Sequence, residues 1–150
     1  MNELKEKLYK ACIDCVVKRI NEAKQAINDA NEAATEESKS SAGDKYETGR
    51  EMMQQETARN LLQLNEANKL MVSLNQLNHN TVSSTADSGS LVLTDNGKFY
   101  IAVSAGSISI DNETYFAVSP ASPIGQKLMG KKPGEDFSLN GKNYKVEKVY

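Results

Sequence analysis

The sequence predicts an α+β protein in which two long helices precede a small antiparallel sheet with one short helix. Apolar residues recur at three- and four-residue steps over the first half of the chain, and the period changes to two after about residue 90. A stretch rich in Ser, Thr, Asn and Gly separates the two patterns. We therefore expect a helical hairpin over residues 1–80, a linker over 81–89 and a C-terminal domain over 90–150.

The first helix is expected from about Asn2 to Ser40, because this stretch contains neither proline nor glycine and its apolar residues form one stripe. The stripe consists of Ile13, Val16 or Val17, Ile20, Ala23, Ile27, Ala30 and Ala33. Most other positions are charged or carry amides. The basic residues of the first half are interpreted as a solvated face; they are Lys5, Lys7, Lys10, Lys18, Arg19 and Lys24.

Cys12 and Cys15 form a C-x-x-C inside this helical pattern. Such a pair can serve redox chemistry or supply half of a zinc site, but the sequence has no second cysteine pair and one histidine, His79. The motif also lies away from a strand-to-helix turn, where redox pairs gain a low pKa. The pattern therefore favours helix packing.

The second helix is expected from about Glu47 to Asn78. Its apolar stripe consists of Ala58, Leu61, Leu64, Ala67, Leu70 or Met71, Leu74 and Leu77. Neither stripe is wide enough to build a core alone, whereas two stripes folded back on each other bury a common seam. The pattern therefore predicts an antiparallel coiled-coil hairpin that projects, because a helix of about 38 residues is on the order of 55 Å long.

The bend of this hairpin, near residues 40–50, contains the sequence GDKYETGRE, in which Asp44 and Glu47 are three residues apart. Two carboxylates at this spacing point to one side of a helix and offer Mg²⁺ the hard oxygen ligands that it prefers. The pair does not complete a metal site alone, so it would need a partner that supplies further ligands. The structural alternative is that Asp44 caps the second helix and Glu47 lies at its positive end.

The second half of the chain reads as short strands. SLVLT, KFYIAVS, SISID and ETYFAVS are separated by turn sequences such as DNG and DNE, so we expect a meander of antiparallel strands. In SPIGQKLMG, Ser122 stands before Pro123 and Gly130 follows the last position, which predicts a short helix. The last segment, DFSLNGKNYKVEKVY, is expected to form a hairpin that turns at Asn140-Gly141.

The order and spacing of these segments resemble the Gre transcript-cleavage factors of bacterial RNA polymerase over nearly the whole chain. SPIGQKLMGKKPGED, residues 122–136, is similar to the family's S-P-I-x-x-x-L-x-G-K-x-x-G-D segment. GDKYE, residues 43–47, is similar to its G-D-x-x-E-N tip motif. The resemblance implies an FKBP-like fold for the C-terminal domain and a function in stimulating the polymerase's own cleavage of backtracked RNA, so the chain itself would not be an enzyme.

The resemblance also implies roles for individual residues. Asp44 and Glu47 would assist the polymerase active site and hold a Mg²⁺ ion shared with the polymerase, with none bound by the protein alone. Ser122, Pro123 and Ile124 would contact the polymerase near the entrance of its secondary channel. The implied partners are bacterial RNA polymerase and, indirectly, the 3′ end of the nascent RNA, and the protein would act as a monomer.

The tip departs from the family pattern, because Lys45 follows the Asp and Thr48, Gly49 and Arg50 follow the Glu. Cationic side chains beside two acids compete with a bound metal ion, and Lys45 and Arg50 can instead contact RNA phosphate. A channel regulator that does not promote cleavage therefore remains an alternative. From other classes, a peptidyl-prolyl isomerase or chaperone and a coiled-coil dimerisation module also remain open.

Composition and charge limit these functions. The chain has 150 residues and a net charge of −2, so the whole molecule lacks the positive field with which proteins hold nucleic acid by counterion release. Any contact with nucleic acid must therefore be local or indirect. No apolar run approaches the length needed to span a bilayer, and the chain opens on MNELKEKLYK, which does not resemble a signal peptide. The expected location is the cytoplasm, without membrane contact.

Overall fold

The computed structural model describes residues 2–40, 44–77 and 84–150. Side chains are described for residues 3–33, 49, 51–77 and 84–150. The described chain divides into two compact units. One unit combines Met1–Cys15 with Val72–Tyr150, and the other consists of Val16–Met71.

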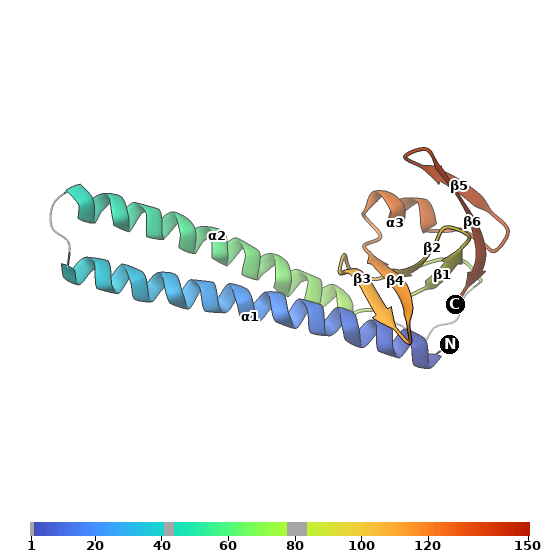
Figure 1. The fold of residues 1–150 in the computed structure, drawn as a ribbon, viewed down its shortest axis with the longest axis horizontal. Helices are drawn as coiled ribbons and strands as arrows, with labels where there is room; N and C mark the ends of the chain where they lie inside the picture. Colours follow the sequence, from blue (N-terminus) through green and yellow to red (C-terminus); the bar gives the residue numbers. More distant parts are fainter. Residues whose placement is uncertain (1, 41–43, 78–83) are drawn as a thin grey trace. The chain divides into compact units, whose positions relative to one another are not determined.

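Two long helices open the chain, as the sequence predicts (Figure 1). Helix α1 (Asn2–Ser40) has the predicted bounds, and α2 (Asp44–Asn75) begins three residues before the expected Glu47 and ends before the expected Asn78. Neither helix contains proline, and α1 also lacks glycine, so nothing in α1 breaks the backbone hydrogen bonding.

Within the unit Val16–Met71, side chains are buried at seven-residue intervals. Val16, Ala23 and Ala30 are buried on α1, and Asn60 and Ala67 are buried on α2. The predicted stripe was wrong at Leu61, which is 46% exposed. Ala58 is exposed as well. Steps of three residues each fall short of a full helical turn, so a line through positions 64, 61 and 58 drifts away from the buried face, whereas alternating steps of three and four remain on it.

Six strands and a short helix follow within residues 84–150. The strands are β1 (Leu91–Thr94), β2 (Gly97–Ile101), β3 (Gly106–Ile110), β4 (Glu113–Val118), β5 (Asp136–Leu139) and β6 (Lys142–Val149), and the helix is α3 (Pro123–Leu128). They form one mixed sheet in the order β3-β4-β2-β1-β6-β5. The α+β class is confirmed, and the sheet has six strands.

The predicted antiparallel meander was wrong at one pairing, because β2 pairs with β4 in parallel. Strands β3 and β4 form their own hairpin, in which Asp111 and Asn112 both have positive φ angles. This hairpin places β3 at the edge of the sheet and β4 beside β2. Alternation along a strand reports which side chains are buried, but it carries no information about which strand lies alongside.

The turn signals of the C-terminal half are confirmed. Strands β5 and β6 form a hairpin through Asn140 and Gly141, whose φ angles of 53° and 81° are those of a tight two-residue turn. Ser122 is the N-cap of α3 and Pro123 is its first residue. Gly130, with a φ of 80°, follows the helix in the left-handed conformation that ends many helices.

We call the unit that combines Met1–Cys15 with Val72–Tyr150 the C-terminal unit, and its core lies on both faces of the sheet. On one face, Leu128 of α3 joins a buried cluster of strand and loop residues: Ala86, Val92, Phe99, Ile101, Val146 and Val149. Tyr100 follows Phe99 and points to the other face, where Tyr9 and Cys12 of α1 lie close enough to influence its ionisation. The first turns of α1 therefore belong to the core of this unit.

Two residues of the predicted linker, Ala86 and Gly89, are hydrogen-bonded to other parts of the C-terminal unit. Residues 81–83 of the predicted linker lie outside the described part. The N–H of Ala86 donates to the carbonyl of Lys131 at 2.8 Å, and its carbonyl accepts from the N–H of Gly130 at 2.8 Å. The N–H of Gly89 donates to the carbonyl of Ile101 at 2.6 Å.

Candidate functional site

The N-terminus of α3 holds the first group of predicted site residues. The Ser122 hydroxyl accepts a hydrogen bond from the N–H of Gly125 at 3.1 Å and donates one to the carbonyl of Ser119 at 2.6 Å. The Ser119 hydroxyl in turn accepts from the N–H of Ala121 at 3.0 Å. The hydroxyl of Ser122 is therefore engaged in shaping this turn, because it satisfies a backbone donor that a helix start leaves without a partner.

Gly125 is a residue of this site that sequence reasoning missed. A Cβ atom at this position would lie 1.9 Å from the carbonyl oxygen of Ser119, a separation at which atoms overlap. The carbonyl of Ser119 approaches the helix this closely because Ser122 holds it. The signal was a glycine within the first turn of a predicted helix, where glycine is otherwise unfavourable.

Pro123 and Ile124 differ in their exposure. Pro123 is exposed at the first position of α3. Ile124 is partly buried and packs against the core cluster. Of the three residues predicted to contact a partner, Pro123 thus presents its ring to solvent, whereas Ser122 and Ile124 also hold α3 in place.

The tip residues lie in the first turns of α2. Asp44 is the first residue of the helix, and Lys45, Glu47 and Arg50 follow within its first two turns. The side chains of these four residues and residues 41–43 lie outside the described part of the structure. Over the side chains that are described, no three His, Cys, Asp or Glu residues gather as ligands for a metal ion.

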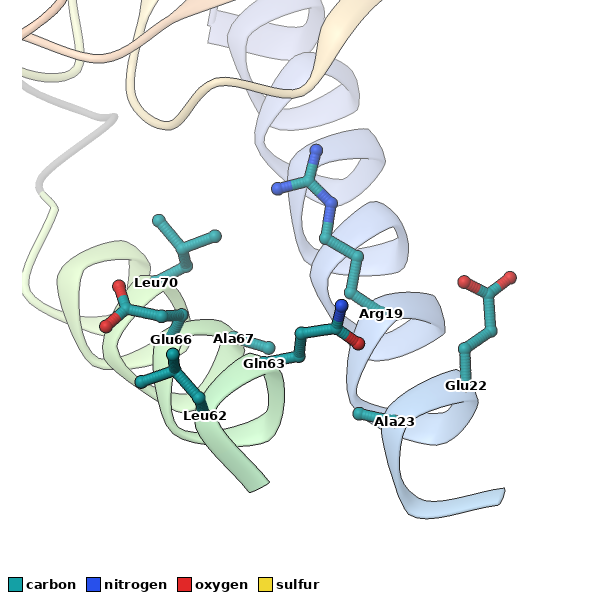
Figure 2. Close-up of a pocket in the computed structure, with 8 residues that line it drawn as sticks. All are labelled: Arg19, Glu22, Ala23, Leu62, Gln63, Glu66, Ala67 and Leu70. Carbon is teal, nitrogen blue, oxygen red and sulfur yellow. The ribbon is translucent and has the colours of Figure 1, made fainter. Parts of the chain in front are cut away.

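A hollow of about 410 Å³ lies within the unit Val16–Met71 (Figure 2). Side chains of both long helices line it: Arg19, Glu22 and Ala23 from α1, and Leu62, Gln63, Glu66, Ala67 and Leu70 from α2. Gln63 extends from α2 toward α1 in Figure 2. The lining is mainly apolar with charged groups around it and holds no paired nucleophile and base, so it offers a contact surface rather than a reaction centre.

The two cysteines have different environments. Cys12 is fully buried, and burial raises the pKa of its thiol to about 12, with the nearby Cys15 adding to the rise. Cys15 is partly exposed. A buried thiol that stays protonated at neutral pH is not a nucleophile, which supports the packing interpretation of the C-x-x-C.

We expect a thiol-alkylating reagent to modify Cys15 and to spare Cys12 in the native protein at pH 8. The reagent reacts with the thiolate, and burial suppresses both the thiolate and the access to Cys12. Intact-mass analysis after iodoacetamide treatment should show one added group under native conditions and two in denaturant. Two groups added at the same rate to the native protein would contradict the buried position of Cys12.

Lys5 corrects the expectation of a solvated basic face on α1. Its side chain is 1% exposed, and burial lowers the pKa of its ammonium group. Position 5 shares a helix face with the buried Leu8 and Cys12, so periodicity places it toward the core despite its charge. Lys7 remains at the surface, where its ammonium nitrogen lies 3.5 Å from a carboxylate oxygen of Asp111.

The fold and these positions define an α+β protein with two long N-terminal helices and a mixed six-stranded sheet. No protein-family model matches the chain, and no curated protein matches it in a sequence comparison. Among the described residues, no helix has the length and apolar character needed to cross a membrane.

Proposed function

We propose that this chain is a Gre-like factor that binds RNA polymerase, inserts its long helices into the secondary channel and stimulates cleavage of backtracked RNA. The observation that carries the proposal is the position of the two motifs. Asp44 of GDKYE is the first residue of α2, and SPIGQKLMG contains the serine-capped helix α3. In this proposal the sheet and α3 form an FKBP-like docking domain, with Ser122, Pro123 and Ile124 at the contact.

We also propose that α1 and α2 form an antiparallel coiled coil. Burial at seven-residue intervals on both helices supports this arrangement, as does the hollow that both helices line. The alanines at Ala23, Ala30 and Ala67 allow a close approach. Helix α1 has 39 residues and is therefore about 58 Å long, a length suited to reaching an active centre inside a narrow channel.

Asn60 provides a test of the coiled coil. Its amide nitrogen is buried without a hydrogen-bond partner, which costs about 1–3 kcal/mol. We expect Asn60→Leu to raise the unfolding free energy of the helical unit by about 1 kcal/mol or more, measured by thermal and urea denaturation at 222 nm. Asn68→Leu changes an exposed amide of the same helix and is the matched control. Equal effects of the two substitutions would contradict a buried seam at Asn60.

The tip supplies the chemistry in this proposal. Asp44 and Glu47 contribute two carboxylates to a Mg²⁺ ion shared with the polymerase, and the polymerase provides the remaining ligands and the RNA. Such an ion, when bound, activates the attacking water and stabilises the leaving oxygen. Lys45 and Arg50 contact RNA phosphate beside the ion. The protein alone is inert because two carboxylates do not complete a magnesium site.

The second candidate function is a regulator that occupies the channel without promoting cleavage. The sequence feature that favours it is the cationic pair Lys45 and Arg50 beside the two acids, because positive charge weakens metal binding. Both candidates share the binding mode and differ in the chemistry at the tip.

The deciding experiment uses purified polymerase from the source organism. Complexes stalled in a backtracked state are incubated with Mg²⁺, with and without the protein, and the RNA is followed on a sequencing gel while binding is measured separately. Faster cleavage on binding is the expected result. Binding without faster cleavage would establish the channel regulator, and absence of binding would reject both candidates.

A further inference from the structure

The charge of the C-terminal unit is unevenly distributed along the chain. Residues 121–150 contain six lysines and three acidic residues, whereas residues 84–120 contain one lysine and four acidic residues. The six lysines are Lys127, Lys131, Lys132, Lys142, Lys145 and Lys148, and none forms an ion pair with a described residue. A protein with a net charge of −2 thus has a local excess of unpaired positive charge.

Aromatic rings cross the sheet beside these lysines. Phe137 of β5 pairs with Tyr144 of β6, and their rings stack with centroids 5.0 Å apart and planes 10° apart. The Tyr144 ring lies 6.1 Å from Phe99, which lies 5.9 Å from Phe116. Phe137 and Tyr144 are partly exposed, and Phe116 is 42% exposed. The rings therefore form a connected row that remains accessible at several points.

One of the lysines shares a sheet face with the stacked pair, and three others belong to the helix that packs on this face and to the loop that follows the helix. Phe137 and Tyr144 pack on the same cluster as α3, and Lys142 lies two residues from Tyr144 and so points to the same face. Lys127 lies in the last turn of α3, and Lys131 and Lys132 lie in the loop from α3 to β5. We call these residues the basic–aromatic face: Lys127, Lys131, Lys132, Lys142, Phe137 and Tyr144.

The other two lysines point away from this face. Lys145 follows Tyr144 directly, so its side chain lies on the opposite side of β6. Lys148 pairs with Leu93, which follows the core residue Val92 and likewise points away from the α3 side. The strand therefore offers two exposed lysines that match those of the basic–aromatic face in charge and differ in placement.

We propose that the basic–aromatic face binds single-stranded nucleic acid. The lysines neutralise successive phosphates, and the accessible parts of Phe137 and Tyr144 stack on unpaired bases. A duplex does not fit this chemistry, since its bases are already stacked and paired. An acidic peptide would use the lysines and leave the rings unused. This contact is separate from Lys45 and Arg50 and does not depend on the polymerase.

The test is fluorescence anisotropy with the full-length protein and a 12-nucleotide, 5′-labelled oligouridine RNA, without polymerase, from 25 to 200 mM KCl. We expect saturable binding that weakens with salt. Lys131→Gln/Lys132→Gln should weaken binding and reduce the slope of log K against log salt by about 1.4, because each phosphate contact with a single strand contributes about 0.7. Lys145→Gln/Lys148→Gln removes the same charge from the other face and should leave the slope unchanged.

The rings are tested separately. Phe137→Leu should lower the affinity about fivefold or more while leaving the salt slope unchanged, because stacking does not release counterions. Tyr144→Phe keeps a ring and should retain native affinity, which distinguishes stacking from the hydroxyl even if Phe137→Leu fails to fold. Far-UV circular dichroism checks the fold of each variant.

Three outcomes would overturn the proposal. The first is the absence of saturable RNA binding at 25 mM KCl, and the second is an equal loss of RNA affinity for the two double-lysine variants. The third is that an oligoglutamate peptide competes as strongly as unlabelled RNA while Phe137→Leu has no effect on affinity. The last result would identify an acidic protein segment as the partner. Because polymerase is absent from this assay, a lack of RNA binding would not contradict the proposed role in RNA cleavage. A negative result in the cleavage assay would likewise not contradict RNA binding by the basic–aromatic face.

Discussion

Replacing Asp44 by Asn or Glu47 by Gln is expected to lower the stimulated RNA cleavage by on the order of 100-fold while the protein still binds RNA polymerase. In the proposed mechanism each substitution removes one negative charge from the ligands of the metal ion that would stabilise the transition state, and single preorganised groups have effects of about that size. Asparagine caps a helix as well as aspartate does, so Asp44→Asn separates metal binding from helix capping. Cleavage rates in backtracked complexes and a separate binding measurement provide the two readouts.

Glu56→Gln is the matched control, because Glu56 is an exposed acid of the same helix, three turns beyond Asp44. It should leave both cleavage and binding unchanged. If Asp44→Asn and Glu47→Gln accelerate cleavage as well as the native protein does, the two acids only stabilise the start of α2 and take no part in cleavage. A uniform loss in all three variants would indicate a general effect of charge.

Gly125→Ala is expected to destabilise the C-terminal unit by about 3 kcal/mol or more. The new Cβ would lie 1.9 Å from the Ser119 carbonyl oxygen, and relief of this overlap requires the backbone of one of the two segments to move. That movement would break the hydrogen bonds of the Ser122 hydroxyl to Ser119 and Gly125 at the N-terminus of α3. Urea denaturation followed by circular dichroism measures the change, and reduced polymerase binding should accompany it.

Gly130→Ala provides the comparison for steric overlap. Gly130 has a φ of 80°, and no atom lies within 4 Å of a Cβ built there. This substitution should therefore lower the unfolding free energy only through the left-handed backbone conformation, by about 1–2 kcal/mol. If Gly125→Ala lowers the unfolding free energy no more than Gly130→Ala does, the backbone around Ser119 adjusts freely to the added Cβ atom.

Local signals predicted the elements of this protein well. The absence of proline and glycine from residues 2–40 predicted the bounds of α1, and Asn140-Gly141 predicted the hairpin of β5 and β6. Ser122 and Pro123 predicted the start of α3. Each signal acts through neighbouring residues, by capping, by backbone conformation or by periodic exposure, and is therefore readable without the fold.

Packing between turns, helices and strands decided the features that sequence reasoning missed. The close approach of Ser119 to Gly125 depends on how one turn folds onto the next, and the burial of Lys5 depends on which face of α1 packs in the C-terminal unit. The hairpin of β5 and β6 was predicted, but the sequence did not show that α3 packs on the same side of the sheet as Phe137 and Tyr144. Residue type alone does not report such neighbours.

The sequence by itself determined the class, the order of the elements and the positions of the two motifs that carry the functional proposal. Only the tertiary structure decided that β4 lies parallel to β2 and that Asn60 rather than Leu61 is buried on α2. The physical reason is the range of the interactions. Helix starts, turns and periodicity result from contacts within a few residues, whereas strand pairing and the choice of buried face result from packing between segments far apart in the chain.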